Sequence, residues 1–118
     1  MVSIEVYGAS DDLVEIEIDG KPFEELSEPN TIKFVAADKI LTVDIKHSGS
    51  RGWQLTATID DDTEEGELPF RVRLVQHRYS PKFIIESDTA LQLFWKDGHK
   101  EMVSRIVRPK AKSEGQEG

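Results

Sequence analysis

The sequence contains no cysteine and only three histidines among its 118 residues. Without thiols the chain cannot form disulfide bonds, a thiolate nucleophile or a zinc site with cysteine ligands. A protein that needs no disulfide suits a reducing compartment, so we expect it in the cytoplasm. We also expect it to need no cofactor and no metal ion.

Long apolar runs are absent as well. No stretch approaches the roughly 20 apolar residues that a membrane-spanning helix needs. The first residues show no basic segment followed by an apolar one, which would mark a signal peptide. We therefore expect no membrane association.

Length and composition predict a single globular domain. Hydrophobic residues make up 37% of the chain and charged residues 32%, which suits a domain with a modest core. Residues 108–118 contain no large apolar side chain and are predicted to be a disordered tail. The predicted domain therefore spans residues 1–107.

Charge of one sign dominates, and it is unevenly distributed. The net charge of −8 is unfavourable for direct nucleic-acid binding, which needs clustered Lys and Arg. Residues 1–69 hold 17 acidic and 5 basic side chains, whereas residues 70–118 hold 6 acidic and 10 basic ones. Either these charges solvate the outer faces of strands, or they form a dipolar surface that steers a charged protein partner.

Apolar and polar residues alternate along most of the chain, which is typical of half-buried strands. The alternating segments are 2–7, 13–18, 32–36, 41–46, 53–59, 70–74, 83–85 and 91–95, with a final strand around 102–107. Asp19-Gly20 and Asp97-Gly98 are hairpin-turn signals. A helical turn is expected at most between Pro22 and Ser27. The sequence predicts an all-β (or β-rich α+β) fold, an antiparallel sandwich or partly closed barrel of about eight short strands with at most one short helix.

The segment Gly8-Ala9-Ser10-Asp11-Asp12-Leu13-Val14-Glu15-Ile16 resembles the opening of small uncharacterised bacterial and phage proteins. Those proteins begin with a strand and a Gly-x-Ser-Asp-Asp-Leu-Val-Glu-Ile motif, and they continue with a strand that opens on Trp, like Trp53, and a Tyr-Ser pair, like Tyr79-Ser80. The resemblance covers most of residues 2–95 in order. It implies a small β-rich fold and supplies no catalytic residues.

Catalytic groups are sparse, so we expect no enzymatic activity. His47, His77 and His99 are far apart in the sequence and lie near predicted strand ends or turns. Ser10 and the Asp11-Asp12 pair are expected to bond backbone N–H groups of their turn rather than to act as a triad or a metal site.

The most acidic stretch, residues 60–67, holds six carboxylates in eight residues. It departs from the EF-hand calcium loop, because the twelfth position counted from Asp60 is Arg71 instead of a glutamate. A solvated loop, weak cation binding and a partner-facing acidic patch remain as alternatives.

Aromatic and aliphatic positions divide into core and surface candidates. Trp53 and Trp95 are in phase with core residues and are predicted to be buried. Val35, Ile84 and Phe94 point away from the main apolar faces of their strands. Either these strands are buried on both faces, or the three residues form an exposed apolar strip that marks an interface or a homodimer contact.

Two functions of different classes fit these observations. The first is a non-catalytic protein-binding module, of the type of a phage- or mobile-element-encoded inhibitor, that docks on a basic face of a bacterial protein. Its partner-binding residues would be Asp60, Asp61, Asp62, Glu64 and Glu65, with Asp11, Asp12 and Glu15 as a second patch. The alternative is a β-barrel that binds a small anionic ligand through Arg71, Arg73 and Arg78.

Overall fold

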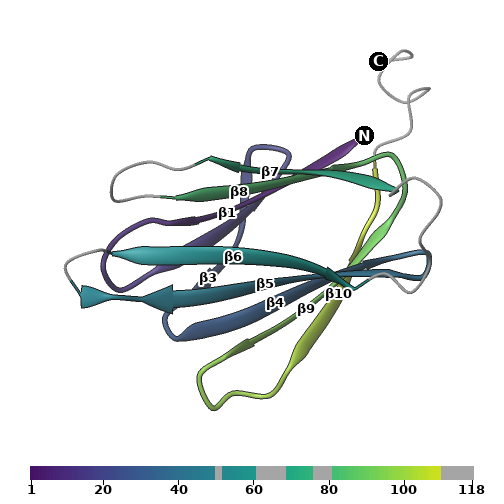
Figure 1. Ribbon diagram of the computed structural model, residues 1–118. Helices are drawn as coiled ribbons and strands as arrows, with labels where there is room; N and C mark the ends of the chain where they lie inside the picture. The colour runs from purple at the N-terminus through teal and green to yellow at the C-terminus, as the bar shows by residue number, and fades with distance from the viewer. Residues whose placement is uncertain (50–51, 61–68, 76–80, 110–118) are drawn as a thin grey trace.

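The computed structural model describes residues 1–49, 52–60, 69–75 and 81–109 (Figure 1). These residues form ten strands and no helix. The strands are β1 (Val2–Gly8), β2 (Val14–Ile18), β3 (Lys21–Leu26), β4 (Pro29–Ala36), β5 (Lys39–His47), β6 (Trp53–Asp60), β7 (Phe70–Val75), β8 (Lys82–Ser87), β9 (Leu91–Asp97) and β10 (Val103–Val107). The prediction of an all-β fold is confirmed, with ten strands instead of about eight.

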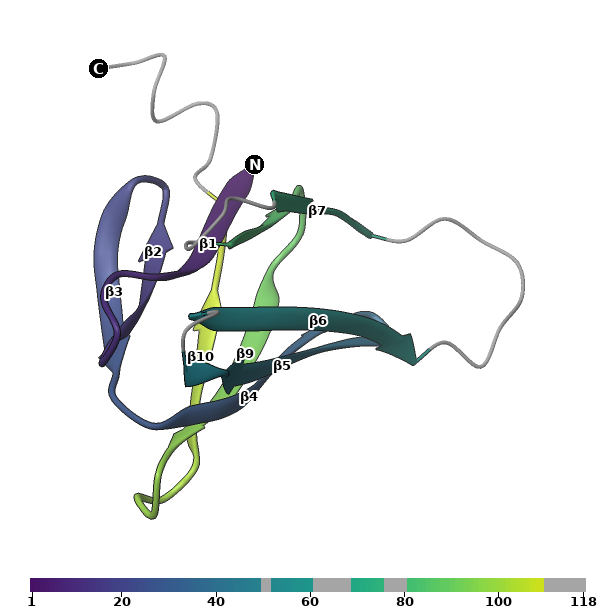
Figure 2. The ribbon, with the colours of Figure 1, turned by 60° about the vertical axis from the view of Figure 1, so that its left-hand side comes forward.

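The strands form two antiparallel sheets of five strands, which pack face to face (Figures 1 and 2). Sheet A has the order β3-β2-β1-β8-β7, and sheet B has the order β10-β9-β4-β5-β6. Neither sheet closes on itself in the described part of the chain. Of the two predicted alternatives, the fold is therefore the sandwich and not the partly closed barrel.

Strand β3 occupies most of the segment between Pro22 and Ser27, for which at most a helical turn was expected, and the described residues contain no helix. β3 is an edge strand of sheet A and pairs with β2 through a bulge between Ile16 and Glu17. Proline is tolerated at such an edge, because its missing N–H is not needed by a second neighbouring strand. Pairing with β2 thus overrides the weak local preference of this segment.

The inner faces of the two sheets form one hydrophobic core. Two aromatic pairs cross it from one sheet to the other. Phe83 of β8 lies 5.8 Å from Phe34 of β4 between ring centroids, and Phe23 of β3 meets Trp95 of β9 edge to face at 5.6 Å. Trp53 and Trp95 are both buried, with 8% and 3% of their surface exposed, as predicted.

Trp53 joins sheet B to the hairpin that follows β1 in sheet A. Its indole Nε1 donates a hydrogen bond of 2.6 Å to the backbone oxygen of Ser10. Its ring packs so closely on Gly8 that a Cβ atom at Gly8 would clash with the ring atom Cδ1. Gly8 therefore makes room for the indole, and the backbone oxygen of Ser10 accepts the hydrogen bond from its N–H.

Within the same hairpin, the loop is closed by its own polar groups. The backbone N–H groups of Ala9 and Ser10 donate to the oxygen of Leu13, and the hydroxyl of Ser10 accepts from the N–H of Asp12. Ser10 thus has the turn-forming role expected from the sequence.

Two further hairpins follow the predicted turn signals. Asp19 and Gly20 have φ values of 53° and 82°, the left-handed conformations that a two-residue hairpin loop needs. Gly98, in the β9–β10 turn, has a φ of 63°. An added Cβ at Gly98 would also lie 2.9 Å from Oε1 of Glu28, but this oxygen ends a flexible side chain that can move, so the left-handed φ is the reason for glycine here.

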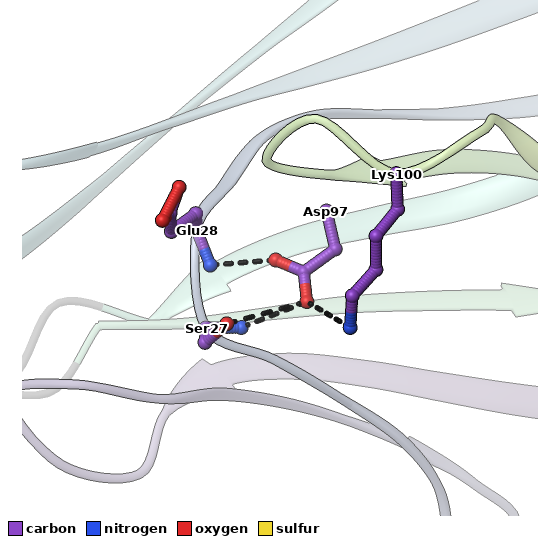
Figure 3. Close-up of polar contacts among 4 residues, drawn as sticks. All are labelled: Ser27, Glu28, Asp97 and Lys100. Atoms are coloured by element: carbon purple, nitrogen blue, oxygen red, sulfur yellow. Dashed lines mark hydrogen bonds and ion pairs between the residues drawn. The ribbon is translucent and has the colours of Figure 1, made fainter.

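Asp97, at the end of β9, fixes the point where the chain passes from sheet A to sheet B (Figure 3). Its carboxylate accepts hydrogen bonds from the backbone N–H of Glu28 at 2.6 Å and of Ser27 at 3.2 Å, and Lys100 Nζ lies 3.7 Å away. Burial acts to raise the pKa of Asp97, but the two backbone N–H groups and the charge of Lys100 outweigh it and lower the pKa below 3.8.

The contact between Gly8 and Trp53 predicts strong coupling. Trp53→Ala should reduce the free energy of unfolding by about 3–5 kcal/mol, and Gly8→Ala by about 1–3 kcal/mol through overpacking. In the double variant the added methyl group meets no indole. Its loss in free energy of unfolding should therefore be smaller than the sum of the losses of the two single variants. Urea denaturation measures all three values.

Gly20 provides the control for this cycle, because it lies in a turn at the other end of β1 from Gly8. Gly20→Ala strains a left-handed residue, and its cost should add to that of Trp53→Ala. Additive losses for Gly8→Ala and Trp53→Ala would contradict the close packing.

Asp97 predicts an acid-sensitive contribution to stability. A carboxyl whose pKa is lowered on folding stabilises the fold above its unfolded value, and this contribution is lost as the pH falls through the folded pKa. Asp97→Asn should cost about 1–3 kcal/mol at neutral pH and should flatten the loss of stability below about pH 4. Asp88 is exposed, so Asp88→Asn is the control. If the free energy of unfolding fell with pH in the same way in both variants, the role of Asp97 would be contradicted.

Candidate functional site

The outer face of sheet A carries rows of side chains that run across the strands. Directly opposed residues in antiparallel strands point to the same side, so the strand register defines each row. The first row is Glu25, Glu15, Tyr7, Lys82 and Val75, and the second is Glu17, Glu5, Ile84 and Arg73. We call these two rows, with Arg71 and Glu86 beside them, the sheet A face.

Charge changes sign across the sheet A face. Its half on β1, β2 and β3, the acidic half, contains four glutamates: Glu5, Glu15, Glu17 and Glu25. Its half on β7 and β8, the basic half, contains Arg71, Arg73 and Lys82, with Glu86 as its acidic member. Part of the uneven charge along the sequence therefore lies on this one surface, as a dipole directed from β3 to β7.

Like charges face each other in the acidic half. Glu15 is directly opposite Glu25, and Glu5 is directly opposite Glu17. Such pairs are unfavourable in a sheet, because carboxylates on directly opposed residues lie close together. Within the described residues, Glu15 and Glu25 have no ion pair or hydrogen bond to offset this repulsion.

Tyr7 lies at the boundary between the two halves. Its hydroxyl donates a hydrogen bond of 2.6 Å to Oε2 of Glu17, and Nζ of Lys82 lies 5.2 Å from the centroid of its ring. The same Nζ forms a 3.1 Å ion pair with Glu5. Tyr7 and Lys82 thus compensate the Glu5–Glu17 pair, and Glu15 and Glu25 remain the uncompensated pair.

The surroundings keep the Tyr7 hydroxyl protonated. Its hydrogen bond to Glu17, partial burial and the negative charges of Glu15, Glu17 and Glu5 raise the pKa of Tyr7 to about 12. A phenol with this pKa stays neutral at physiological pH and does not act as a base or nucleophile there. The chemistry that this face favours is attraction of positive charge on its acidic half.

The residues predicted to bind a partner fall in different places. Glu15 lies in the acidic half, and Asp11 and Asp12 lie in the adjoining hairpin beside Trp53. Asp60 ends β6, about 23 Å along that strand from Trp53 at roughly 3.3 Å per residue. The other four, Asp61, Asp62, Glu64 and Glu65, lie outside the described residues. Asp60 and the hairpin that contains Asp11 and Asp12 therefore lie at opposite ends of β6.

The arginines of the alternative hypothesis lie at the opposite edge of the sheet A face. Arg71 and Arg73 are on the outer side of β7, where Nε of Arg71 is 3.9 Å from Oε1 of Glu86. Arg78 lies outside the described residues. Because the sheets stay open, Arg71 and Arg73 do not surround a barrel mouth, and that part of the alternative was wrong.

The predicted apolar strip is divided between the two sheets. Val35 and Phe94 are on the outer face of sheet B, whereas Ile84 is on the outer face of sheet A and only 8% exposed. Ile84 has Glu5 opposite it on β1 and Arg73 opposite it on β7. Of the two alternatives, a single strip of all three residues is therefore not formed, because β8 belongs to sheet A whereas β4 and β9 belong to sheet B.

The two described histidines, His47 and His99, have different surroundings. The ring of His47 packs edge to face on Trp53 at 4.8 Å, and His99 lies in the β9–β10 turn. His77 lies outside the described residues. Within the described part of the chain, no three His, Cys, Asp or Glu side chains are close enough together to hold a metal ion.

Several residues of the sheet A face were missed as functional candidates. Glu5, Tyr7 and Glu17 could have been found, because period-two alternation and the hairpin loop between β1 and β2 place them on one outer face beside Glu15. Glu25 was missed because no strand was predicted for the segment that forms β3. Lys82 could not be found, since its pairing with Tyr7 joins segments 75 residues apart.

Comparisons of the chain with family models, with curated proteins and with solved structures find no match. Among the described residues, no helix has the length and apolar character needed to cross a membrane. The candidate site therefore depends on the geometry of the sheet A face alone.

The Glu15–Glu25 pair predicts a gain in stability on neutralisation. Glu25→Gln should raise the free energy of unfolding by a few tenths of a kcal/mol, up to about 1 kcal/mol, and less at high salt, where repulsion is screened. Glu24→Gln is a matched control, because Glu24 is on the same edge strand but opposite the apolar Ile16. Equal effects of the two substitutions in urea denaturation would show that the repulsion is negligible.

Proposed function

We propose that this protein is a non-catalytic protein-binding module that docks a basic surface of its partner onto the acidic half of the sheet A face. The observation that supports this most is the Glu15–Glu25 pair. Two opposed carboxylates without a compensating cation cost the free protein stability. Lysine or arginine side chains of a partner would remove that cost on binding, so the arrangement is unfavourable alone and favourable in a complex.

The charge of the whole molecule supports the same function. A net charge of −8 and a dipole across one face attract and orient a basic partner before contact. Such steering mainly increases the association rate and depends on ionic strength. The hairpin with Asp11 and Asp12 follows β1 directly and extends the acidic surface at its end.

Inhibition is the form of binding that the resemblance to small bacterial and phage proteins favours. A basic surface on a bacterial protein commonly binds an anionic substrate or nucleic acid. An acidic module that covers this surface would compete with that ligand. Once the partner is captured, its activity in the presence of this protein tests the inhibitory role.

The proposal predicts how charge variants change binding. A partner captured from a bacterial lysate on the wild-type protein is compared with the double variant Glu15→Gln, Glu25→Gln by binding kinetics at low and moderate salt. The double variant should associate several-fold more slowly, with a weaker dependence on salt. Glu24→Gln, which changes the same charge on the opposite side of β3, should behave more like the wild type.

Reversal of Asp60, Asp61 and Asp62 to lysine tests the competing acidic segment. If this triple variant slows association and the Glu15, Glu25 variant does not, the segment after β6 is the binding surface and the acidic half of the sheet A face is not. Unchanged rates and salt dependence in all variants would mean that these carboxylates only solvate the surface.

A further inference from the structure

The two edges of sheet A are built differently. The β3 edge carries Pro22, a bulge opposite Ile16 and Glu17, and charged residues, all of which discourage another strand from pairing with it. The β7 edge has neither a proline nor a bulge. β7 pairs with β8 from Phe70 to Val75 without a register shift and contains no proline.

An edge strand presents the backbone N–H and C=O groups of alternate residues to an incoming strand. Among the described residues, no strand pairs with the outer edge of β7. Its six regular residues are enough to form a ladder of ordinary strand length. The backbone of β7 is therefore ready to pair with an extended segment.

Side chains along β7 give this edge two different sides. Phe70, Val72 and Leu74 point to the inner side of the sheet, and Arg71 and Arg73 point to the outer side. Leu74 on β7 and Ile59 on β6 are 38% and 40% exposed, so the sandwich is incompletely covered here. An open hollow of about 730 Å³ lies along this edge and is lined by apolar residues, by both arginines and by Glu86: Ile59, Phe70, Arg71, Val72, Arg73, Ile84 and Glu86.

The positive charges of Arg71 and Arg73 are not neutralised by close ion pairs within the described residues. The side chain of Arg71 is 74% exposed and lies at 3.9 Å from Glu86, a long ion pair. Arg73 forms no ion pair or hydrogen bond within the described part of the chain. Both guanidinium groups can thus donate hydrogen bonds to carboxylates of another molecule on the solvent side of β7.

We propose that the free edge of β7 binds an extended segment of another protein by β-strand addition, and that carboxylate and aliphatic side chains alternate along this segment. A strand added to β7 continues the pleat of the sheet, so its alternate side chains fall on opposite sides. Aliphatic groups lie on the inner side, beside the exposed Ile59 and Leu74 and beside Val72. Carboxylates lie beside Arg71 and Arg73.

A second copy of this chain fits the edge less well. A copy of β7 that keeps its apolar residues on the inner side places Arg71 opposite Arg73, or an arginine opposite itself. Like charges in these positions repel. The same arginines that attract an acidic strand therefore act against self-pairing of β7.

This site is independent of the acidic half proposed to bind a basic partner. It lies at the opposite edge of sheet A, and it selects the opposite charge. The variant Glu15→Gln, Glu25→Gln should therefore leave it intact, so that failure of one proposal can be told from failure of the other.

The test uses a fluorescent capped peptide, Ser-Val-Glu-Ile-Glu-Val-Ser, with the full chain. Fluorescence anisotropy should show saturable binding, which is lost when both glutamates of the peptide are replaced by lysine. Arg71→Gln with Arg73→Gln should weaken binding about five-fold or more, as expected for the loss of two exposed ion pairs. The control Lys33→Gln with Lys96→Gln removes two cations from sheet B and should leave the affinity unchanged.

Two N-methylated peptides test for backbone pairing. Methyl groups are placed on one set of alternate amides in the first peptide and on the other set in the second. In β-strand addition only one set faces β7, so one peptide should lose binding and the other should retain it. Full binding by both peptides would show simple charge attraction and overturn the proposal.

Two other outcomes would also overturn it. The first is no binding of the unmodified peptide at millimolar concentration, or equal binding to the arginine variant. The second is a dimer in analytical ultracentrifugation that the peptide does not dissociate and that the Arg71→Gln, Arg73→Gln variant strengthens, since this would place a second copy at the edge.

Discussion

The contact between Trp53 and the hairpin after β1 is the interaction on which the arrangement of the two sheets depends. Apolar packing between the inner faces is strong but has little direction, because many placements bury a similar area. The indole adds direction. Its ring fits only where Gly8 leaves space, and its N–H reaches only the backbone oxygen of Ser10. One end of sheet B is thereby held against one end of β1.

Asp97 plays a similar positioning role where the chain passes from sheet A to sheet B, because it joins the end of β9 to the link between β3 and β4. The link between β3 and β4 carries the backbone N–H groups of Ser27 and Glu28, and the carboxylate of Asp97 accepts a hydrogen bond from each of them. A carboxylate suits this position because it has acceptor capacity for both bonds. Polar contacts at the ends of the sandwich thus define its geometry, and the apolar middle supplies most of its stability.

Because the inner faces are buried in the core, other molecules can contact only the outer faces and the edges of the sheets. On sheet A these surfaces differ in charge over a short distance. Strands lie about 4.8 Å apart, so the step from Glu15 through Tyr7 to Lys82 spans roughly 10 Å. The acidic half and the β7 edge are near enough for one large partner to contact both, and distinct enough in chemistry to be separated by mutation.

The sequence by itself determined the fold class, the alternation of buried and exposed residues, and most of the turns. Each of these follows from local rules: a period of two for strands, and left-handed residues such as Gly98 for tight turns. It also indicated that Trp53 and Trp95 are buried. Only the tertiary structure decided which strands are neighbours, and that pairing placed Lys82 beside Tyr7, separated Ile84 from Phe94, and made Lys21–Leu26 an edge strand. Pairing between distant segments depends on the packing of whole sheets, a cooperative property that no short stretch of sequence contains.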